Sequence, residues 1–190
     1  PHYIAKKCLE KKIINIHIST DCVFNGKIGN YSEKNLTNSI DYYGISKSIG
    51  EVIMPYTIII RTSIIGNEIN SNHGLLEWFL SHKKFQTVNG FSKAYFSGLT
   101  TLELSKIILK YFINKKRKFK SPIHISGPKI NKYDLISIIN KVYNKKVIIN
   151  KNSSFKVDKS LNSSIFVKSS GYKIKSWQKM LQENKIFNEK

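Results

Sequence analysis

Apolar and polar positions along the chain fall into alternating blocks that predict helices and strands in turn. Residues 13–18 and 57–61 are rich in isoleucine, which is typical of strands that are buried in a parallel sheet. Segments with apolar residues at helical spacing lie around these strands. The predicted helices are 4–12, 41–54, 74–82, 100–114, 131–143 and 176–184, and two further strands are 123–126 and 147–149. This alternation predicts an α/β fold with a largely parallel sheet.

Several residues mark the ends of the predicted helices. Pro55 disfavours helical backbone in the residue before it, so the second helix is expected to end there. Thr100 and Glu103 have the spacing of a capping box, in which the threonine side chain and the glutamate satisfy free backbone amides. Asn131 is a suitable N-cap for the helix that follows it.

Polar residues follow both of the predicted central strands. Ser19, Thr20 and Asp21 come directly after the first strand, and Thr62 and Ser63 come directly after the second. Ligands of open α/β sheets bind outside the carboxyl ends of the strands. We therefore expect a binding site at this edge of the sheet, although a loop or helix-cap role for Thr20 and Asp21 is the alternative, and the likelier one for Ser19.

The formal net charge of +20 suggests an anionic partner, but the type of basic residue argues against nucleic acid. Arg61 and Arg117 are the two arginines, and the other basic residues are lysines. Nucleic-acid sites favour arginine, whose planar guanidinium contacts phosphates and guanine in a bidentate way. The basic cluster at 115–118 is predicted to be the solvated end of a helix. We expect no nucleic-acid partner, whereas the positive field would favour a phosphate-bearing ligand.

The remaining composition predicts a cytoplasmic protein without a metal site. The uncharged apolar runs are far shorter than the ~20 residues that a membrane-spanning helix requires, so no membrane partner is expected. Cys8 and Cys22 are predicted to be free thiols, because neither has neighbours that suit a zinc site. Cys22 also lacks a nearby histidine that could activate it as a nucleophile, so a packing role is favoured.

Tyr43 and Lys47 are the residues with the clearest chemistry. They are four residues apart on a predicted helix, so they share one face. A lysine ammonium in that position favours the phenolate form of tyrosine, which can then act as a general acid or base. The same spacing is common on lysine-rich helix surfaces, where it has no function, and its meaning therefore depends on the surrounding sequence.

That surrounding sequence resembles the extended short-chain dehydrogenase/reductases, and most closely their dTDP-4-dehydrorhamnose reductase branch. The strings HISTDCVFNG (17–26), YGISKSIGE (43–51) and TIIIRTSIIG (57–66) carry the resemblance. It continues through 126–127, 132–135, 158–163, 171–172 and 176–177. Each string alone is weakly specific, but together they cover the whole chain.

The resemblance implies the C-terminal part of a Rossmann-type doubly wound parallel sheet plus a small α/β substrate-binding region. Residues 1–66 would form the C-terminal half of the NAD(P)-binding domain, with the catalytic tyrosine and lysine. Residues 67–190 would form the substrate-binding region, interleaved with the last Rossmann elements. A homodimer is one candidate assembly.

The implied reaction is reduction of a 4-keto group on a nucleotide-activated deoxysugar by NADPH or NADH, as in dTDP-L-rhamnose synthesis for surface polysaccharide. Tyr43 would protonate the carbonyl oxygen. Lys47 would favour the tyrosine phenolate and hydrogen-bond the nicotinamide ribose, and Ile18 would also contact the cofactor. Thr20 would complete the catalytic set by hydrogen-bonding the substrate oxygen.

The substrate-binding residues implied by the resemblance are Thr20, Asp21 and Ile64. Two of the family's aromatic positions are altered, because Cys22 follows Asp21 and Ile64 stands where a tryptophan often occurs. The loss of these stacking surfaces leaves the identity of the sugar open.

The glycine-rich loop that binds the dinucleotide in this family does not occur in the sequence. The nearest glycines, Gly26 and Gly29, lie in the loop predicted over 22–40. Since the chain also opens on Pro1 within a predicted helix, we expect an N-terminal truncation of roughly 90 residues, or about three strand–helix units. The 190 residues alone are then expected to be inactive.

Two other functions remain open at this point. The first is a non-catalytic regulatory subunit that binds NAD(P) or a nucleotide sugar, similar to the regulatory subunit of methionine adenosyltransferase. The second is a related epimerase or dehydratase. These enzymes usually have an additional acid/base pair beside the catalytic threonine, which Thr20-Asp21-Cys22 does not provide.

Overall fold

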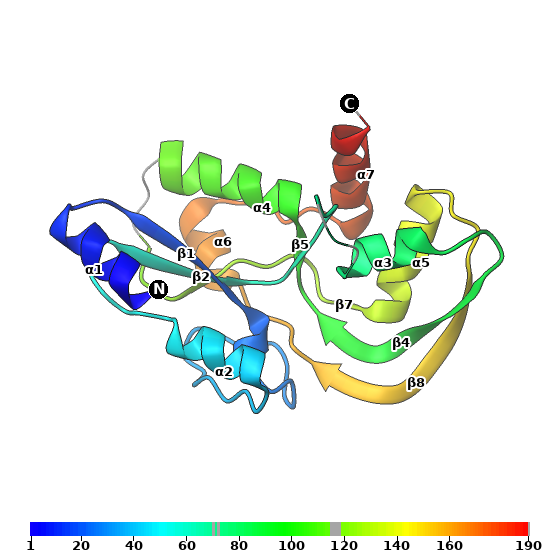
Figure 1. Ribbon diagram of the computed structural model, residues 1–190, viewed down its shortest axis with the longest axis horizontal. Coiled ribbons are helices and arrows are strands. Elements are labelled where there is room, and N and C mark those ends of the chain that lie inside the picture. The colour runs from blue at the N-terminus through cyan, green and yellow to red at the C-terminus, as the bar shows by residue number, and fades with distance from the viewer. Residues whose placement is uncertain (70, 72, 115–118, 190) are drawn as a thin grey trace.

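The computed structural model describes residues 1–69, 71, 73–114 and 119–189 (Figure 1). A first sheet contains three parallel strands in the order β1 (Asn15–Thr20), β2 (Thr57–Thr62) and β6 (Ile123–His124). In β1 and β2, Asn15 pairs with Thr57 and Thr20 with Thr62, so both strands end at the same edge. The predicted α/β class with parallel strands is confirmed.

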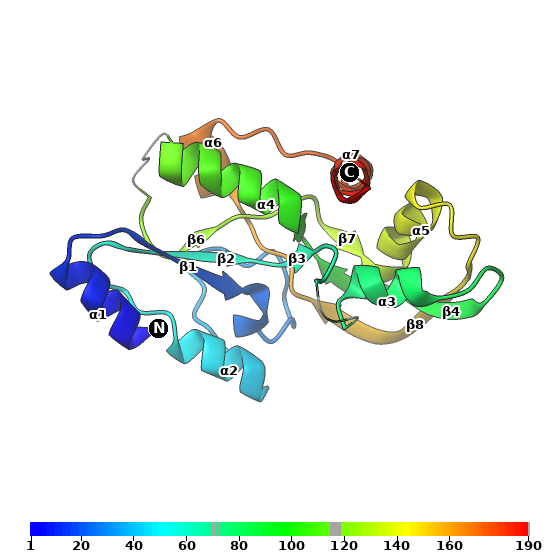
Figure 2. The ribbon, with the colours of Figure 1, turned by 45° about the horizontal axis from the view of Figure 1, so that its top comes forward.

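Helices cover both faces of this sheet. Figure 2 shows α1 (His2–Glu10) and α2 (Tyr42–Ile49) on one face, and α4 (Thr101–Ile107) and α6 (Ser164–Ser170) on the other. This layering buries the isoleucines of β2, where Ile59 and Ile60 are fully buried. A strand buried on both faces reads as a continuous apolar run, which is why β2 was predictable.

A second sheet contains three strands in the order β7 (Ile130–Asn131), β4 (Thr87–Phe96) and β8 (Ile148–Asp158). Its central strand, β4, pairs in parallel with β8 and antiparallel with β7. Helix α5 (Lys132–Val142) packs on β4, and α7 (Trp177–Asn188) packs on α5. The remaining elements are α3 (Leu75–Ser81) and the short parallel pair β3 (Ile64–Ile65) and β5 (Leu99–Thr100).

One apolar core joins the two sheets, because its members come from both. Ile60 and Ile123 belong to the first sheet, while Phe96 belongs to β4 and Leu135 to α5. A separate small cluster lies under the loop after β1 and consists of Val23, Phe24, Tyr31 and Leu161. This second cluster fixes a loop that would otherwise have little apolar contact.

Several predicted boundaries were wrong. The helix predicted over 41–54 ends at Ile49, with Gly50 as its C-cap, well before Pro55. The first strand begins at Asn15, because Lys12 adopts a left-handed backbone conformation (φ 55°) that reverses the chain after α1. The helix predicted over 100–114 changes at Ile108 into a π-helical segment that extends to Asn114.

Strand β4 and helix α6 were not predicted, and β8 was predicted only over 147–149. In β4 the buried positions include Gly90, Ser92 and Ala94, so burial alternates although hydrophobicity does not. Strand β8 is mostly polar and exposed, and its pairing with β4 defines it. Neither strand therefore has the apolar alternation on which strand prediction rests.

Both predicted N-caps are confirmed, but the capping box is only half formed. The Asn131 side chain accepts from the Asp134 amide, and the Thr100 hydroxyl accepts from the Glu103 amide. The Glu103 carboxylate instead accepts hydrogen bonds from Tyr172 and Lys175. The basic cluster at 115–118 lies outside the described residues. Within the described ranges, no helix has both the length and the apolar character needed to cross a membrane.

Candidate active site

A hollow of about 310 Å³ lies at the carboxyl ends of β1 and β2. Its lining includes every residue that was predicted to have a site role, and these residues come from β1, the following 3₁₀ turn, α2 and β3. They are Ile18, Thr20, Asp21, Tyr43, Lys47 and Ile64. Ser19, Cys22, Thr62 and Ser63 complete the lining. The structure thus brings together residues that are up to 46 positions apart in the sequence.

Helix α2 is held beside this hollow by its first residues. The Asp41 carboxylate caps the helix by accepting from the Gly44 amide at 2.7 Å, and this bond lowers the pKa of Asp41. Gly44 lies so close to the loop after β1 that a Cβ there would overlap the carbonyl oxygen of Cys22. The close approach that glycine permits therefore sets the position of Tyr43, its neighbour.

Lys47 and Tyr43 differ in how firmly the protein holds them. The Lys47 ammonium donates to the carbonyl oxygen of Ile18 at 3.0 Å, which fixes it against β1 and leaves two N–H groups for other acceptors. Tyr43 is 57% exposed, so its phenol is accessible from the open side of the hollow. A proton donor of this kind must be accessible to a ligand.

Thr20 and Asp21 are buried at the base of the hollow. The Thr20 hydroxyl donates to the Asp21 carboxyl at 3.2 Å and accepts from the Cys22 amide at 3.1 Å. Burial raises the pKa of Asp21, although the hydrogen bond from Thr20 and the charge of Lys159 oppose this effect. The single proton of the Thr20 hydroxyl is thus directed at Asp21, and the hydroxyl must turn away from this carboxyl to donate to a ligand.

The two altered aromatic positions also lie at the hollow. Burial raises the pKa of the Cys22 thiol, and the neighbouring Asp21 adds to this effect, so the reactive thiolate is disfavoured. Ile64 is 47% exposed and presents an aliphatic surface. Both cysteines are free thiols, as predicted. Among the described residues, no group of three or more His, Cys, Asp or Glu side chains could hold a metal ion.

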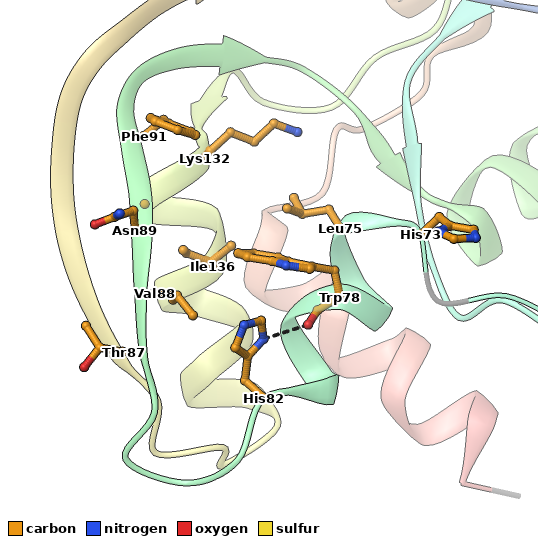
Figure 3. A pocket seen from close by; sticks show the side chains of 11 residues that line it. His73, Leu75, Trp78, His82, Thr87, Val88, Asn89, Phe91, Lys132 and Ile136 are labelled. Atoms are coloured by element: carbon orange, nitrogen blue, oxygen red, sulfur yellow. Dashed lines mark hydrogen bonds between the residues drawn. The ribbon is translucent and has the colours of Figure 1, made fainter.

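Two further hollows lie along β4, and sequence reasoning did not find them. One of about 230 Å³ shares Asp21, Cys22 and Ser63 with the first and is otherwise lined mainly by β4 and β8. The other, of about 630 Å³, lies between α3, β4 and α5 (Figure 3). Phe91 and Lys132 line both of these hollows. The sequence shows no apolar alternation over β4, so neither this strand nor the two hollows along it could be predicted.

A buried polar cluster lies next to the hollow and joins Glu51 to the strands of the first sheet. The Arg61 guanidinium donates to the Glu51 carboxylate, with Nη2 at 2.6 Å and Nε at 2.9 Å from its oxygens. Ser19 donates to the same carboxylate at 2.5 Å. His124 lies on the other side of Arg61, with its Nε2 3.4 Å from Nη1 of Arg61. The cluster links the segment after α2 to β1, β2 and β6.

His124 is held in its neutral form by this cluster. Its Nδ1 donates to the Tyr31 carbonyl oxygen at 3.0 Å, so Nε2 is the acceptor that faces Arg61. Burial lowers the pKa of His124 to about 4, and the charge of Arg61 adds to this effect. A proton on Nε2 would point directly at the guanidinium.

This environment predicts acid sensitivity of the fold. The histidine pKa is about 6.5 in an unfolded chain, so as the pH falls from about 6.5 to about 4 the unfolded state takes up a proton that the folded state does not. The free energy of unfolding should decrease by roughly 3 kcal/mol over this window and should be unaffected by His124 above it. Urea unfolding of the wild type and His124→Gln between pH 4 and 7.5 measures this. The free energy of unfolding should fall less steeply with decreasing pH in the variant than in the wild type. Equal slopes would contradict it, since the raised pKa of Asp21 acts alike in both proteins.

Comparisons with known proteins show which family the chain belongs to. The model of a protein family described as the RmlD substrate binding domain matches residues 1–183. A dTDP-4-dehydrorhamnose reductase from Aggregatibacter actinomycetemcomitans is 29% identical over 160 residues, which are 78% of this chain and 53% of that protein. The chain therefore spans about half the length of this curated relative.

Two crystal structures are similar in fold. A hypothetical dTDP-4-dehydrorhamnose reductase from Sulfolobus tokodaii has a TM-score of 0.74 and 30% identity, with 87% of this chain and 61% of that chain covered. A dTDP-4-dehydrorhamnose reductase from Bacillus anthracis, in complex with NADP, has a TM-score of 0.79 and 20% identity, with 97% and 69% covered. The Rossmann-type fold is thereby confirmed. Since the family model covers nearly the entire chain, the chain belongs to the RmlD substrate binding domain family, and its predicted relation to the dTDP-4-dehydrorhamnose reductases is confirmed.

Proposed function

We propose that the protein reduces the 4-keto group of a nucleotide-linked deoxysugar, with NADPH or NADH as the reductant. The observation that carries this proposal is the convergence of Thr20, Tyr43 and Lys47 on one hollow at the carboxyl ends of β1 and β2. A hydroxyl, a phenol and an ammonium there provide what carbonyl reduction needs from a protein, which is a fixed orientation of the oxygen and a proton for it.

Each of these residues has a distinct task in the proposed reaction. The Thr20 hydroxyl turns away from the Asp21 carboxyl and donates its single proton to the substrate carbonyl oxygen. Tyr43 gives its phenolic proton to that oxygen, and the Lys47 ammonium stabilises the phenolate that remains. When bound, the reduced nicotinamide supplies the hydride that the carbonyl carbon receives. The two N–H groups of Lys47 that Ile18 leaves free suit the hydroxyls of the nicotinamide ribose.

The three hollows suit a substrate with several parts, because the one of about 230 Å³ shares lining residues with each of the other two. The hollow of about 630 Å³ is of the size that small-molecule ligands occupy, and Trp78, Leu75 and Phe91 give it an apolar lining that suits a nucleoside. The hollow of about 230 Å³ joins it to the catalytic residues and suits a sugar. In this arrangement the sugar carbonyl lies near Thr20 and Tyr43, with the nucleoside further along β4.

The proposal is tested with a protein that carries these residues behind a glycine-rich cofactor-binding segment, because none occurs within the 190 residues. We expect it to oxidise NADPH or NADH when dTDP-4-keto-6-deoxyglucose or its 3,5-epimer is added, with one dTDP-6-deoxysugar formed per cofactor. Tight binding of the sugar nucleotide without turnover would instead support a non-catalytic regulatory subunit. The 190 residues alone should give no turnover.

A further inference from the structure

Lys132 lies at the boundary between two of the hollows. It is the first residue of α5, and its side chain lines both the hollow of about 630 Å³ and the one of about 230 Å³. Figure 3 shows the side chain extending from the start of α5 next to Phe91. A ligand that occupied both of these hollows would therefore lie next to this ammonium group.

The ammonium of Lys132 has no hydrogen-bond acceptor in the described part of the chain. Its nitrogen lies 3.9 Å from the centre of the Phe96 ring, and Asp21 acts on it through its charge without forming an ion pair. Burial lowers the pKa of Lys132, which reflects the unfavourable environment of the charged form. Lys132 is only partly buried, so its three N–H donors still reach water, and a ligand that enters the hollow can replace this water as their acceptor.

Other lysines that line the hollows, or lie beside a residue that lines them, have acceptors in the protein. Lys47 donates to the Ile18 carbonyl oxygen, and Lys129 forms an ion pair with Asp158. Lys159 lies 3.8 Å from the Asp41 carboxylate. Lys132 therefore stands out as a cation whose donors are directed into a binding site, where a ligand can supply the missing acceptors.

We propose that Lys132 binds the phosphate groups of the substrate. This inference rests on the proposed function and adds a binding residue that the catalytic motifs do not include. In a nucleotide sugar the diphosphate lies between the nucleoside and the sugar, and Lys132 lies between the hollows assigned to these two parts. An ammonium that lacks acceptors offers strong, charge-assisted hydrogen bonds to phosphate oxygens.

Calorimetric titration of the chain with dTDP and with thymidine tests this role separately from catalysis. The wild type should bind dTDP more tightly than thymidine. Lys132→Met, which keeps an unbranched side chain, should weaken dTDP binding about 10- to 100-fold and leave thymidine binding within about twofold. Lys132→Arg should retain most of the affinity for dTDP, because it keeps the charge. The matched control is Lys129→Met, whose ammonium lies nearby but is paired with Asp158, and dTDP binding should not change.

The possible results separate this inference from the proposed function. Equal loss of dTDP and thymidine binding in Lys132→Met, no loss of either, or a wild type that does not prefer dTDP would each overturn the phosphate-binding role. Thermal unfolding of each variant shows whether a loss of binding reflects a loss of fold. Turnover in the longer protein is measured independently, so reduction that does not depend on Lys132 would leave the proposed function in place.

Discussion

Replacement of Tyr43 by phenylalanine is expected to lower kcat about 10²- to 10⁴-fold and to change KM for the sugar nucleotide by less than about threefold. The change removes one hydroxyl, which is the group proposed to protonate the substrate oxygen. Because the Tyr43 side chain is 57% exposed, its hydroxyl makes little contribution to packing. The measurement is steady-state NADPH oxidation, in the longer protein that carries the cofactor-binding segment.

The neighbouring residue provides a matched control for this prediction. Tyr42 lies on the same helix, is 94% exposed and does not line the hollow that Tyr43 lines, so Tyr42→Phe should retain nearly full activity. Similar activity in Tyr43→Phe and Tyr42→Phe would exclude Tyr43 as the proton donor. A large increase in KM with unchanged kcat would instead indicate a binding role.

The hollow at the carboxyl ends of β1 and β2 could be predicted because its residues follow two strands with strong sequence signals. The isoleucine runs of β1 and β2 indicate buried parallel strands, and parallel strands end at a common edge. Thr20, at the end of β1, pairs with Thr62 at the end of β2. The helical spacing of Tyr43 and Lys47 predicts that they share one face of α2. Gly44 and the Asp41 cap then place that helix beside the end of β1.

The hollows along β4 could not be predicted in the same way, because β4 and β8 are defined by their pairing with each other and not by an apolar pattern of their own. Strand β4 buries glycine, serine and alanine positions, and β8 is largely polar, so neither shows apolar alternation. Lys132 was correctly placed at the start of a helix, but a lysine there usually lies in solvent. Its position between two hollows depends on β4, and therefore on contacts between distant parts of the chain.

Removing one partner of the ion pair between Glu51 and Arg61 is expected to cause a large loss of stability. Their side chains are 6% and 7% exposed, and the carboxylate also accepts from Ser19. Removing one partner leaves a buried charge without compensation, which costs about 3–5 kcal/mol. Glu51→Ala should lower the free energy of unfolding by about this amount, measured by urea denaturation at pH 7.

Two comparisons isolate the buried charge as the cause of this effect. Glu10→Ala breaks the exposed pair of Lys7 and Glu10, which has a similar distance of 2.7 Å, and should cost less than about 1 kcal/mol. The double variant Glu51→Leu with Arg61→Met replaces both charges by apolar groups and should be more stable than Glu51→Ala, because no charge is left unpaired. The single variants Glu51→Leu and Arg61→Met complete the comparison. If the double variant loses as much stability as these two single variants together, the pair is not coupled and the prediction is wrong. Because Glu51 lies only two residues after the end of α2, a confirmed coupling would also mean that this pair holds the helix of Tyr43 and Lys47 against β2.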